Sequence, residues 1–370
     1  MTDCFENGFR RGLLWNGCEC NLETRGNSIN FETGASAAVS YASNMKRIAL
    51  VFALGAALAC PTFAQPAGST NAASASPPPG AGDGGAAAVS LDPITKGLRV
   101  FTVGHSFHVW VARIVLEMAQ SAGIQDHQVA GLMGVGGSTV LQCWDVPDMK
   151  SKKKQPPENT AKKALMAGQV DVLTLSPIWM PDEGIEKFAA LGLQYNPNIR
   201  VTVQEFWLPN DTYEPVYPLN IKKQPTVDHN AATMPELRKH YEAYFHDVDN
   251  YVQAVNQKLG KDAVLIVPIG QATLALREKI VAGQAPGIAT QAELFRDPWG
   301  HPTAPLQVLS GYCHFAVIYR RSPVGLPMPP ELKGKYRNDA LNGLLQELAW
   351  EAVVHHPMSG VKVGAPIKSI

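Results

Sequence analysis

The sequence lacks an excess of charge of either sign. Its 32 basic and 32 acidic residues give a formal net charge of +0 over 370 residues. Nucleic acids and anionic lipid surfaces attract proteins through a strong positive field, so we discount both as partners. Charged residues make up only 17% of the chain and hydrophobic residues 45%. This composition favours a well-buried core and argues against a disordered protein.

The sequence also lacks a hydrophobic run of the length that a lasting membrane span requires. Ile48 to Ala59 is continuously apolar, but it is too short to cross a bilayer. The run follows Met45-Lys46-Arg47 and precedes Thr62-Phe63-Ala64, the order of a secretory signal peptide. We therefore predict that residues 45–65 direct export and that the mature protein is periplasmic or secreted.

Cysteines are few, six in the whole chain. Ala57-Leu58-Ala59-Cys60 resembles a bacterial lipobox, so lipidation of Cys60 is an alternative processing route. Cys18 and Cys20 are too close in sequence for a standard zinc knuckle, and we assign them no metal. Cys143 and Cys313 follow later in the chain. In an oxidising compartment they could pair, but two separate buried thiols fit the sequence equally well.

The chain divides into segments of different composition. Residues 1–44 precede the predicted signal peptide, and we interpret them as sequence upstream of the true start at Met45, outside the fold. Residues 66–93 are rich in Ala, Gly, Ser and Pro and cannot bury a core, so they are expected to form a flexible tether. We expect residues 94–370 to form one folded domain.

Strand-like and helix-like segments alternate through this domain, and no internal repeat is visible. The pattern predicts a three-layer α/β/α fold with a mostly parallel central sheet. In such sheets ligands bind at the carboxyl ends of the strands, so chemistry is expected in the segments that follow them. The predicted strands are 98–103, 129–133, 170–175, 199–206 and 263–267, and the predicted helices are 107–120, 160–167, 184–191, 234–259, 273–281, 306–319 and 339–355.

Ser106 follows the first predicted strand directly. A helix that starts behind it would offer free backbone N–H groups and a favourable dipole to a developing oxyanion. The alternative is that Ser106 only caps this helix, although Val109 three residues on forms no capping box with it. His108 stands where an α/β-hydrolase elbow needs glycine, which argues against that fold.

Val103-Gly104-His105-Ser106-Phe107 resembles the first sequence block of the SGNH hydrolases, also called GDSL-like esterases. In that family an Asp-x-x-His motif follows near the C-terminus, and Asp297 and His301 stand in the corresponding place. The resemblance implies that Ser106 is the nucleophile, that His301 is its general base and that Asp297 orients His301. It also implies an SGNH, flavodoxin-like sheet and no cofactor.

The resemblance covers most of residues 98–325 in block order, and residues 319–326 look like the tail of related bacterial exported SGNH-like proteins. Two departures stand out. Three residues separate Asp297 from His301 where the family has two, which changes how the carboxylate can reach the imidazole. The family's Gly-x-Asn-Asp block, whose Asn donates to the oxyanion, is absent. Without this family context, His301 would be read as a surface loop histidine.

The remaining oxyanion donors are assigned through the same resemblance. The family's second block is a glycine whose backbone N–H binds the oxyanion, and Gly136-Gly137-Ser138 follows a predicted strand. Gly137 is the preferred donor beside the Ser106 N–H, with Gly136 as its neighbour. Ser176, at the end of the strand where the Asn would stand, is the candidate replacement. The alternative reading of the glycines is a turn that needs a positive φ.

Several aromatic residues fall near predicted strand ends. We expect His105, Trp179, Trp207 and Trp299 to contact the substrate, since aromatic rings there could stack on a sugar. The alternative for these tryptophans, and for Trp144, is that they belong to the core or form pocket walls. Export and stacking together favour an acylated carbohydrate as the ester substrate.

Two other functions stay open. The missing Asn and the altered Asp–His spacing motivate a non-catalytic SGNH-like binding protein. A metal-dependent hydrolase would use His105 and His108, but no third ligand has a motif, so we predict no metal site. The pair His355-His356 is expected to be solvated.

Overall fold

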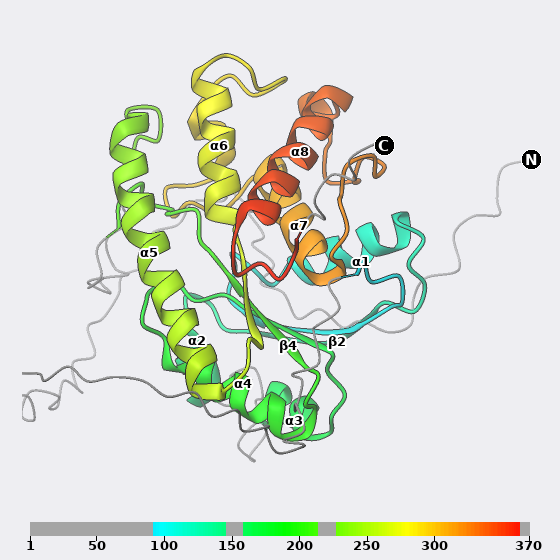
Figure 1. Cartoon of the computed structure of the whole chain (residues 1–370). Helices are drawn as coiled ribbons and strands as arrows, with labels where there is room; N and C mark the ends of the chain where they lie inside the picture. The colour runs from blue at the N-terminus through cyan, green and yellow to red at the C-terminus, as the bar shows by residue number, and fades with distance from the viewer. Residues whose placement is uncertain (1–91, 146–157, 214–226, 363–370) are drawn as a thin grey trace, which may run out of the picture. The chain divides into compact units, whose positions relative to one another are not determined.

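Five parallel strands form the sheet at the centre of the protein (Figure 1). The computed structural model describes residues 92–145, 158–213 and 227–362, which all belong to one compact unit. The predicted signal peptide, Cys60 and nearly all of the predicted tether lie outside the described residues. The strands run in the order β2-β1-β3-β4-β5, and every neighbouring pair is parallel. They are β1 (Arg99–Gly104), β2 (Gln128–Gly134), β3 (Val172–Leu175), β4 (Arg200–Gln204) and β5 (Val264–Val267).

Burial of the strands follows their place in the sheet. Almost every residue of β1, β3, β4 and β5 is buried, which is typical of parallel sheets covered on both faces. In β2, at the edge, only Met133 is buried. The predicted α/β class with a parallel sheet is confirmed.

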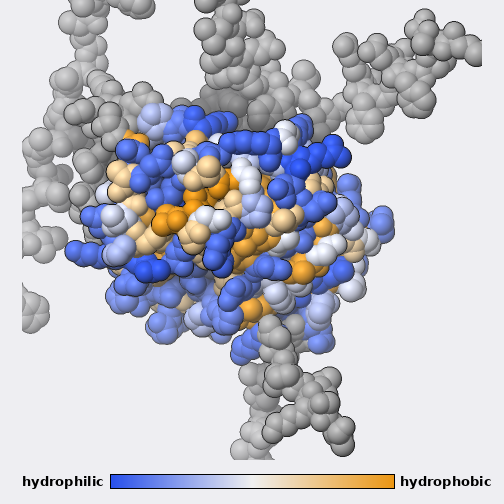
Figure 2. Space-filling view, turned by 90° about the horizontal axis from the view of Figure 1, so that it is seen from above, coloured by the Kyte–Doolittle hydropathy of each residue, from blue (hydrophilic) through white to orange (hydrophobic). Residues whose placement is uncertain are grey.

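Helices cover both faces of the sheet (Figure 1). Hydrophilic side chains surround an apolar band on the face seen in Figure 2. No helix in the described part of the chain is both long and apolar enough to cross a membrane. The helices on one face of the sheet are α1 (Val111–Ser121), α6 (Ile269–Val281), α7 (Ala304–Tyr319) and α8 (Asp339–His355). On the other face lie α2 (Val140–Asp145), α3 (Thr160–Met166) and α4 (Glu183–Tyr195), and α5 (Met234–Leu259) lies beside β5. Short 3-10 turns span Gln291–Leu294 and Gly334–Tyr336.

The helices confirm the predicted alternation with strands, and their ends differ most from the predicted ends where tertiary contacts set the boundary. The bounds of α5 match the sequence, because Thr233 and Glu236 form a capping box and Gly260 ends the helix at φ 65°. The six-residue α2 was not predicted. The expected helix directly behind Ser106 is wrong: α1 begins at Val111, so Ser106 caps no helix and the helix-dipole argument for it does not hold.

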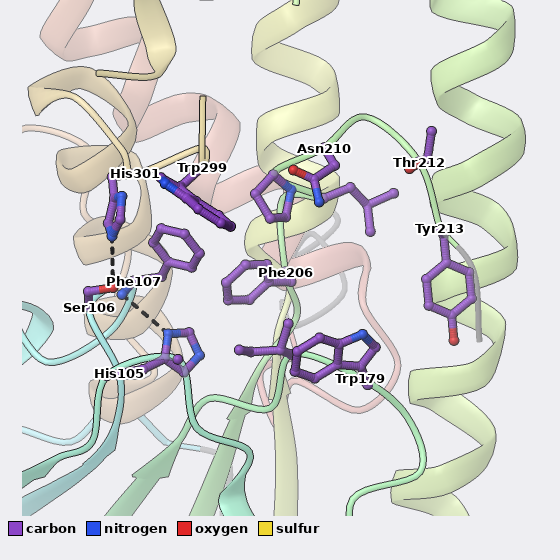
Figure 3. Close-up of a pocket in the computed structure, with 15 residues that line it drawn as sticks. His105, Ser106, Phe107, Trp179, Phe206, Asn210, Thr212, Tyr213, Trp299 and His301 are labelled. Atoms are coloured by element: carbon purple, nitrogen blue, oxygen red, sulfur yellow. Dashed lines mark hydrogen bonds between the residues drawn. The ribbon is translucent and has the colours of Figure 1, made fainter. Parts of the chain in front are cut away.

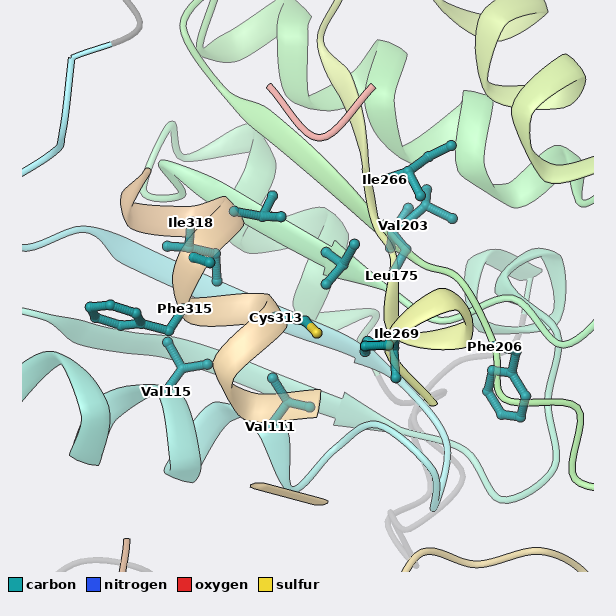
Figure 4. Close-up of a cluster of buried hydrophobic side chains, with 14 of the residues drawn as sticks. Val111, Val115, Leu175, Val203, Phe206, Ile266, Ile269, Cys313, Phe315 and Ile318 are labelled. Carbon is teal, nitrogen blue, oxygen red and sulfur yellow. The ribbon is translucent and has the colours of Figure 1, made fainter. Parts of the chain in front are cut away.

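The core is continuous through the sheet and the helices on both sides, and Figure 4 shows part of it. Helix α7 is apolar on all sides and buried along its length between the sheet, α1 and α8. Cys313 lies on this helix, and Cys143 lies on α2 across the sheet. Both thiols are buried and unpaired. Of the two alternatives for Cys143 and Cys313, the structure therefore shows two separate buried thiols and no disulfide between them.

His356 corrects another expectation. The predicted solvation holds for His355, but His356 is only 2% exposed. The chain after α8 turns back to β5, where Met358 O accepts a hydrogen bond from Ile266 N at 2.9 Å. This return places His356 Nε2 3.9 Å from Glu205 Oε1. Glu205 is itself fully buried, and burial raises its pKa to about 8.

The contact between α2 and α4 depends on Gly184. A Cβ at this position would lie 2.3 Å from Leu141 N and from Val140 C, which are backbone atoms. Asp182 fixes the same junction, because its carboxylate accepts hydrogen bonds from the backbone N–H groups of Val140, Leu141 and Gly184. The two helices can approach this closely only where α4 has no side chain.

We predict that Gly184→Ala destabilises the protein by about 1–3 kcal/mol or more, because the added methyl group overlaps fixed backbone. Gly343→Ala in α8 is the matched control. A Cβ at Gly343 would contact nothing within 4 Å, so alanine should stabilise the helix by up to about 1 kcal/mol. Urea unfolding of the full chain measures both free energies. Equal effects of the two substitutions would contradict the close approach at Gly184.

Candidate active site

The topology places the site at one end of β1. In the sheet β1 lies between β2 and β3, so the connection from β2 to β3 passes β1. The connections that follow β1 and β3 therefore leave towards opposite faces of the sheet. Ligands of doubly wound sheets bind at this switch point, beside the carboxyl ends of the strands. Ser106 lies two residues beyond the end of β1 and is exposed.

Ser106, His301 and Asp297 form a hydrogen-bonded chain. Ser106 Oγ lies 2.8 Å from His301 Nε2 (Figure 3). On the other side of the ring, His301 Nδ1 lies 2.8 Å from Asp297 Oδ2 and 3.0 Å from Oδ1. The three predicted residues are thus brought together in the arrangement of nucleophile, base and orienting carboxylate.

The carboxylate of Asp297 is held in its ionised form. Partial burial acts to raise its pKa, but hydrogen bonds from the His301 ring and from the backbone N–H groups of His301 and Trp299 outweigh this effect and lower it. The two backbone bonds to Oδ1 measure 3.2 Å and 3.1 Å. Asp297 therefore fixes both the ring of His301 and the loop that carries it.

Gly300 explains how the loop accommodates the longer Asp–His spacing. It adopts φ 77°, a left-handed conformation that favours glycine. A Cβ there would lie 2.4 Å from Pro209 Cβ, so the loop also packs directly on the segment after β4. The ends of the loop are joined by a hydrogen bond of 2.9 Å from Arg296 N to His301 O. The extra residue thus leaves the Asp297–His301 contact intact.

His108 anchors the turn that carries Ser106. Its ring is fully buried, with Nδ1 2.8 Å from Gln204 Oε1 and Nε2 2.8 Å from Thr174 Oγ1. Burial lowers its pKa to about 4, so the ring is neutral at neutral pH. Because both ring nitrogens contact protein atoms, His108 offers no lone pair to a metal.

His105 forms part of the pocket wall but is also tied to the protein. Its Nδ1 accepts a hydrogen bond of 3.4 Å from Phe107 N, and its Nε2 lies 3.3 Å from Ser176 Oγ. Burial lowers the pKa of His105 to about 3. Among the residues described, no cluster of three or more His, Cys, Asp or Glu side chains could hold a metal ion.

The glycine loop after β2 reaches the site, and Ser176 does not. Gly136 and Gly137 are exposed and line the pocket, and Gly137 adopts φ 64°. Nothing in the described structure accepts a hydrogen bond from the backbone N–H of Ser106, Gly136 or Gly137. Ser176 is fully buried beneath the pocket against His105, so its predicted place beside the oxyanion is wrong.

Two of the three predicted tryptophans line the pocket. Trp179 and Trp299 face it, but Trp207 is 0% exposed and lies behind the wall. Trp207 stacks on Phe206 with ring centroids 4.7 Å apart, and its Nε1 donates to Gly300 O at 3.0 Å. Its predicted contact with substrate is therefore wrong, because the indole N–H donates to a backbone carbonyl inside the protein.

The pocket has a volume of about 350 Å³. Much of its wall comes from the segment after β4, from which only Trp207 was predicted to contact the substrate. The Pro209-Asn210 pair, which begins five residues past Gln204 at the end of β4, was the available signal, since loops that follow strand ends commonly line sites in parallel sheets. The residues that line the pocket are His105, Ser106, Phe107, Gly136, Gly137, Ile178, Trp179, Phe206, Leu208, Pro209, Asn210, Thr212, Tyr213, Trp299 and His301.

A buried ion pair holds this segment in place. Arg277 is 0% exposed and donates to both carboxylate oxygens of Asp211, at 3.1 Å for the Nη2–Oδ2 contact. His229 Nδ1 lies 2.9 Å from the same carboxylate. Asp211 and Leu208 adopt φ of 57° and 43°, conformations that cost free energy unless the surroundings impose them. The pair therefore fixes the strained turn that lines the pocket.

The comparisons with known proteins assign no family to this chain. No family model and no curated protein match the chain. Among solved structures, a DUF4886 family protein from Bacteroides uniformis has 13% sequence identity and a TM-score of 0.42, over 70% of this chain and 95% of that chain. A similarity at this level carries no argument about function.

We predict that Arg277→Met destabilises the protein by about 3–5 kcal/mol, because it leaves the Asp211 carboxylate buried without its cation. Hydrogen exchange should accelerate most in residues 206–213. Arg238→Met is the matched control: Arg238 pairs with Glu278 on the surface, and its loss should cost less than about 1 kcal/mol. Similar losses in both variants, or unchanged exchange in residues 206–213, would contradict the assignment.

Proposed function

We propose that the protein is an exported serine esterase of the SGNH type that hydrolyses carboxylic esters. The strongest support is the chain of contacts from Ser106 Oγ through His301 to Asp297, with 2.8 Å at each side of the imidazole. The block order of the sequence and the parallel sheet with helices on both faces agree with this type. Export is proposed from the signal-peptide pattern of residues 45–65.

The geometry supports the following reaction. Ser106 Oγ attacks the ester carbonyl carbon while its proton passes to His301 Nε2, which lies within hydrogen-bond reach. Asp297 holds Nδ1–H of the ring and stabilises the imidazolium that forms. The carbon–oxygen bond to the alcohol then breaks, and His301 gives its proton to the departing oxygen. The acyl group stays on Ser106.

The second half repeats these steps with water. His301 takes a proton from the water, whose oxygen attacks the acyl carbon, and then returns a proton to Ser106 Oγ as the carboxylic acid leaves. In both tetrahedral states the negative oxygen would be held by the backbone N–H groups of Ser106 and Gly137. This is a two-donor hole, without the third donor that the family obtains from Asn.

A non-catalytic SGNH-like binding protein is the second candidate. It is favoured by one observation: Ser176, the candidate substitute for the missing Asn, is buried against His105 and reaches no oxyanion. Removing one oxyanion donor lowers kcat by about 10²–10³ in a well-studied protease. A two-donor hole therefore implies a slower enzyme if the chain is catalytic, and turnover separates the two candidates.

We predict that the full chain hydrolyses p-nitrophenyl acetate and that Ser106→Ala and His301→Ala each lower kcat by about 10⁴–10⁶, since each removes a group that acts in every step. Asp297→Asn should lower it by about 10⁴, because the amide leaves the wrong imidazole tautomer. His246→Ala, an exposed histidine on α5, is the control and should retain activity.

Initial rates at saturating ester measure these effects, and near-ultraviolet circular dichroism checks that each variant is folded. Loss of activity with a chelator would point instead to a metal-dependent hydrolase. A folded wild type with no turnover above the buffer rate would contradict the esterase and favour the binding protein.

A further inference from the structure

We infer that the pocket beside Ser106 takes the acyl group of its ester, and that this acyl group is uncharged, apolar and larger than acetyl. The inference rests on the proposed function and adds the substrate class to it. It follows from three features of the pocket: the chemistry of its walls, its position relative to Ser106 and its volume.

The walls of the pocket are apolar and carry no charge among the residues described. Apart from the catalytic pair, they consist mainly of aromatic and aliphatic side chains, with Phe206 and Leu208 only 1% and 5% exposed. His105 is neutral, because burial lowers its pKa to about 3. A charged acyl group would lose its water here without gaining a partner of opposite charge.

The polar side chains lie at the far end. In Figure 3, Ser106 and His301 stand at one side, Phe107, Trp299 and Phe206 follow, and Asn210 and Thr212 lie beyond them. A sugar ring carries hydroxyl groups around its whole edge, and each buried hydroxyl without a partner is costly. The aromatic middle of the pocket therefore fits a hydrocarbon group better than a carbohydrate.

The position of the pocket favours the acyl part over the alcohol. The alcohol takes its proton from His301 and leaves, whereas the acyl group stays bonded to Ser106. Ser106 is exposed and His301 is partly exposed, so a departing alcohol has direct access to solvent. A bulky alcohol, including a carbohydrate, can stay outside while its acyl group enters the pocket.

The volume sets a lower limit on size. At about 350 Å³ the pocket has room for many waters, since one water needs only ~10–15 Å³ of such space. An acetyl methyl group would leave most of this space to water against apolar walls. Each further methylene displaces such water and contributes about a fourfold gain in binding. A chain of about six carbons or an aromatic acyl group uses this surface.

The test compares p-nitrophenyl acetate, butyrate, hexanoate and hemisuccinate as substrates of the full chain. We expect kcat/KM for hexanoate to exceed that for acetate by about 10- to 100-fold, in line with four added methylenes and incomplete burial. The hemisuccinate should fall at least about tenfold below the butyrate, because its carboxylate would be buried without a partner.

Variants of the wall tie this preference to the pocket. Trp179→Ala should lower the hexanoate-to-acetate ratio about fivefold or more, because it removes apolar wall without touching the triad. Trp144→Ala is the matched control; this partly buried indole on α2 packs on Phe188 of α4, away from the pocket, and the ratio should not change. Thr212→Lys places a cation at the far end and should raise the hemisuccinate-to-butyrate ratio.

The outcomes separate this inference from the proposed function. Hydrolysis of acetate as fast as hexanoate, or of hemisuccinate as fast as butyrate, would overturn the acyl pocket and leave the esterase standing. If no ester is hydrolysed, the proposed function fails. Binding of phenyl hexanoate and phenyl acetate to the Ser106→Ala protein, followed by tryptophan fluorescence, then decides: tighter binding of the hexanoate supports the apolar pocket, and equal binding contradicts it.

Discussion

The contact between Ser106 and His301 depends on a loop that is itself fixed from inside the protein. Asp297 binds the ring of His301 and two backbone N–H groups of the loop. Gly300 lets the same loop pack on Pro209. The segment that contains Pro209 is fixed in turn by the buried Arg277–Asp211 pair. A buried ion pair is weak evidence for stability, but breaking one side of it is costly, so it can hold a strained turn in one conformation.

The nucleophile side is fixed by a different set of contacts. The ring of His108 contacts Gln204 at the end of β4 and Thr174 on β3, and His314 on α7 lies 3.3 Å from the same Gln204 oxygen. These rings are buried and neutral, so they bind as hydrogen-bonding groups and not as charges. Two independent anchors, one for each partner, thus set the distance between the serine and the histidine.

The sequence predicted what local chemistry determines. Five strands and the long α5 follow from apolar runs, a capping box and a glycine C-cap, and Ser106, Asp297 and His301 were found through motif order. It did not predict where side chains near strand ends point. Ser176 and Trp207 face inward because His105 and the Gly300 carbonyl are their partners, and those contacts join residues far apart in the chain.

The turn after β4 was missed for the same reason. Asp211 adopts a left-handed conformation because Arg277, which is 66 positions away, holds its carboxylate. Likewise His356 is buried because the chain after α8 pairs with β5. No local pattern encodes such pairs, so half of the pocket wall became visible only with the fold.

The central claim is that Ser106 is an activated nucleophile. Its most direct test is covalent labelling of the full chain with a serine-reactive phosphonate, followed by mass spectrometry of the peptides. We expect one adduct, on Ser106, that is absent in Ser106→Ala and forms much more slowly in His301→Ala. A folded wild-type protein that forms no adduct, or an adduct that persists in Ser106→Ala, would contradict it.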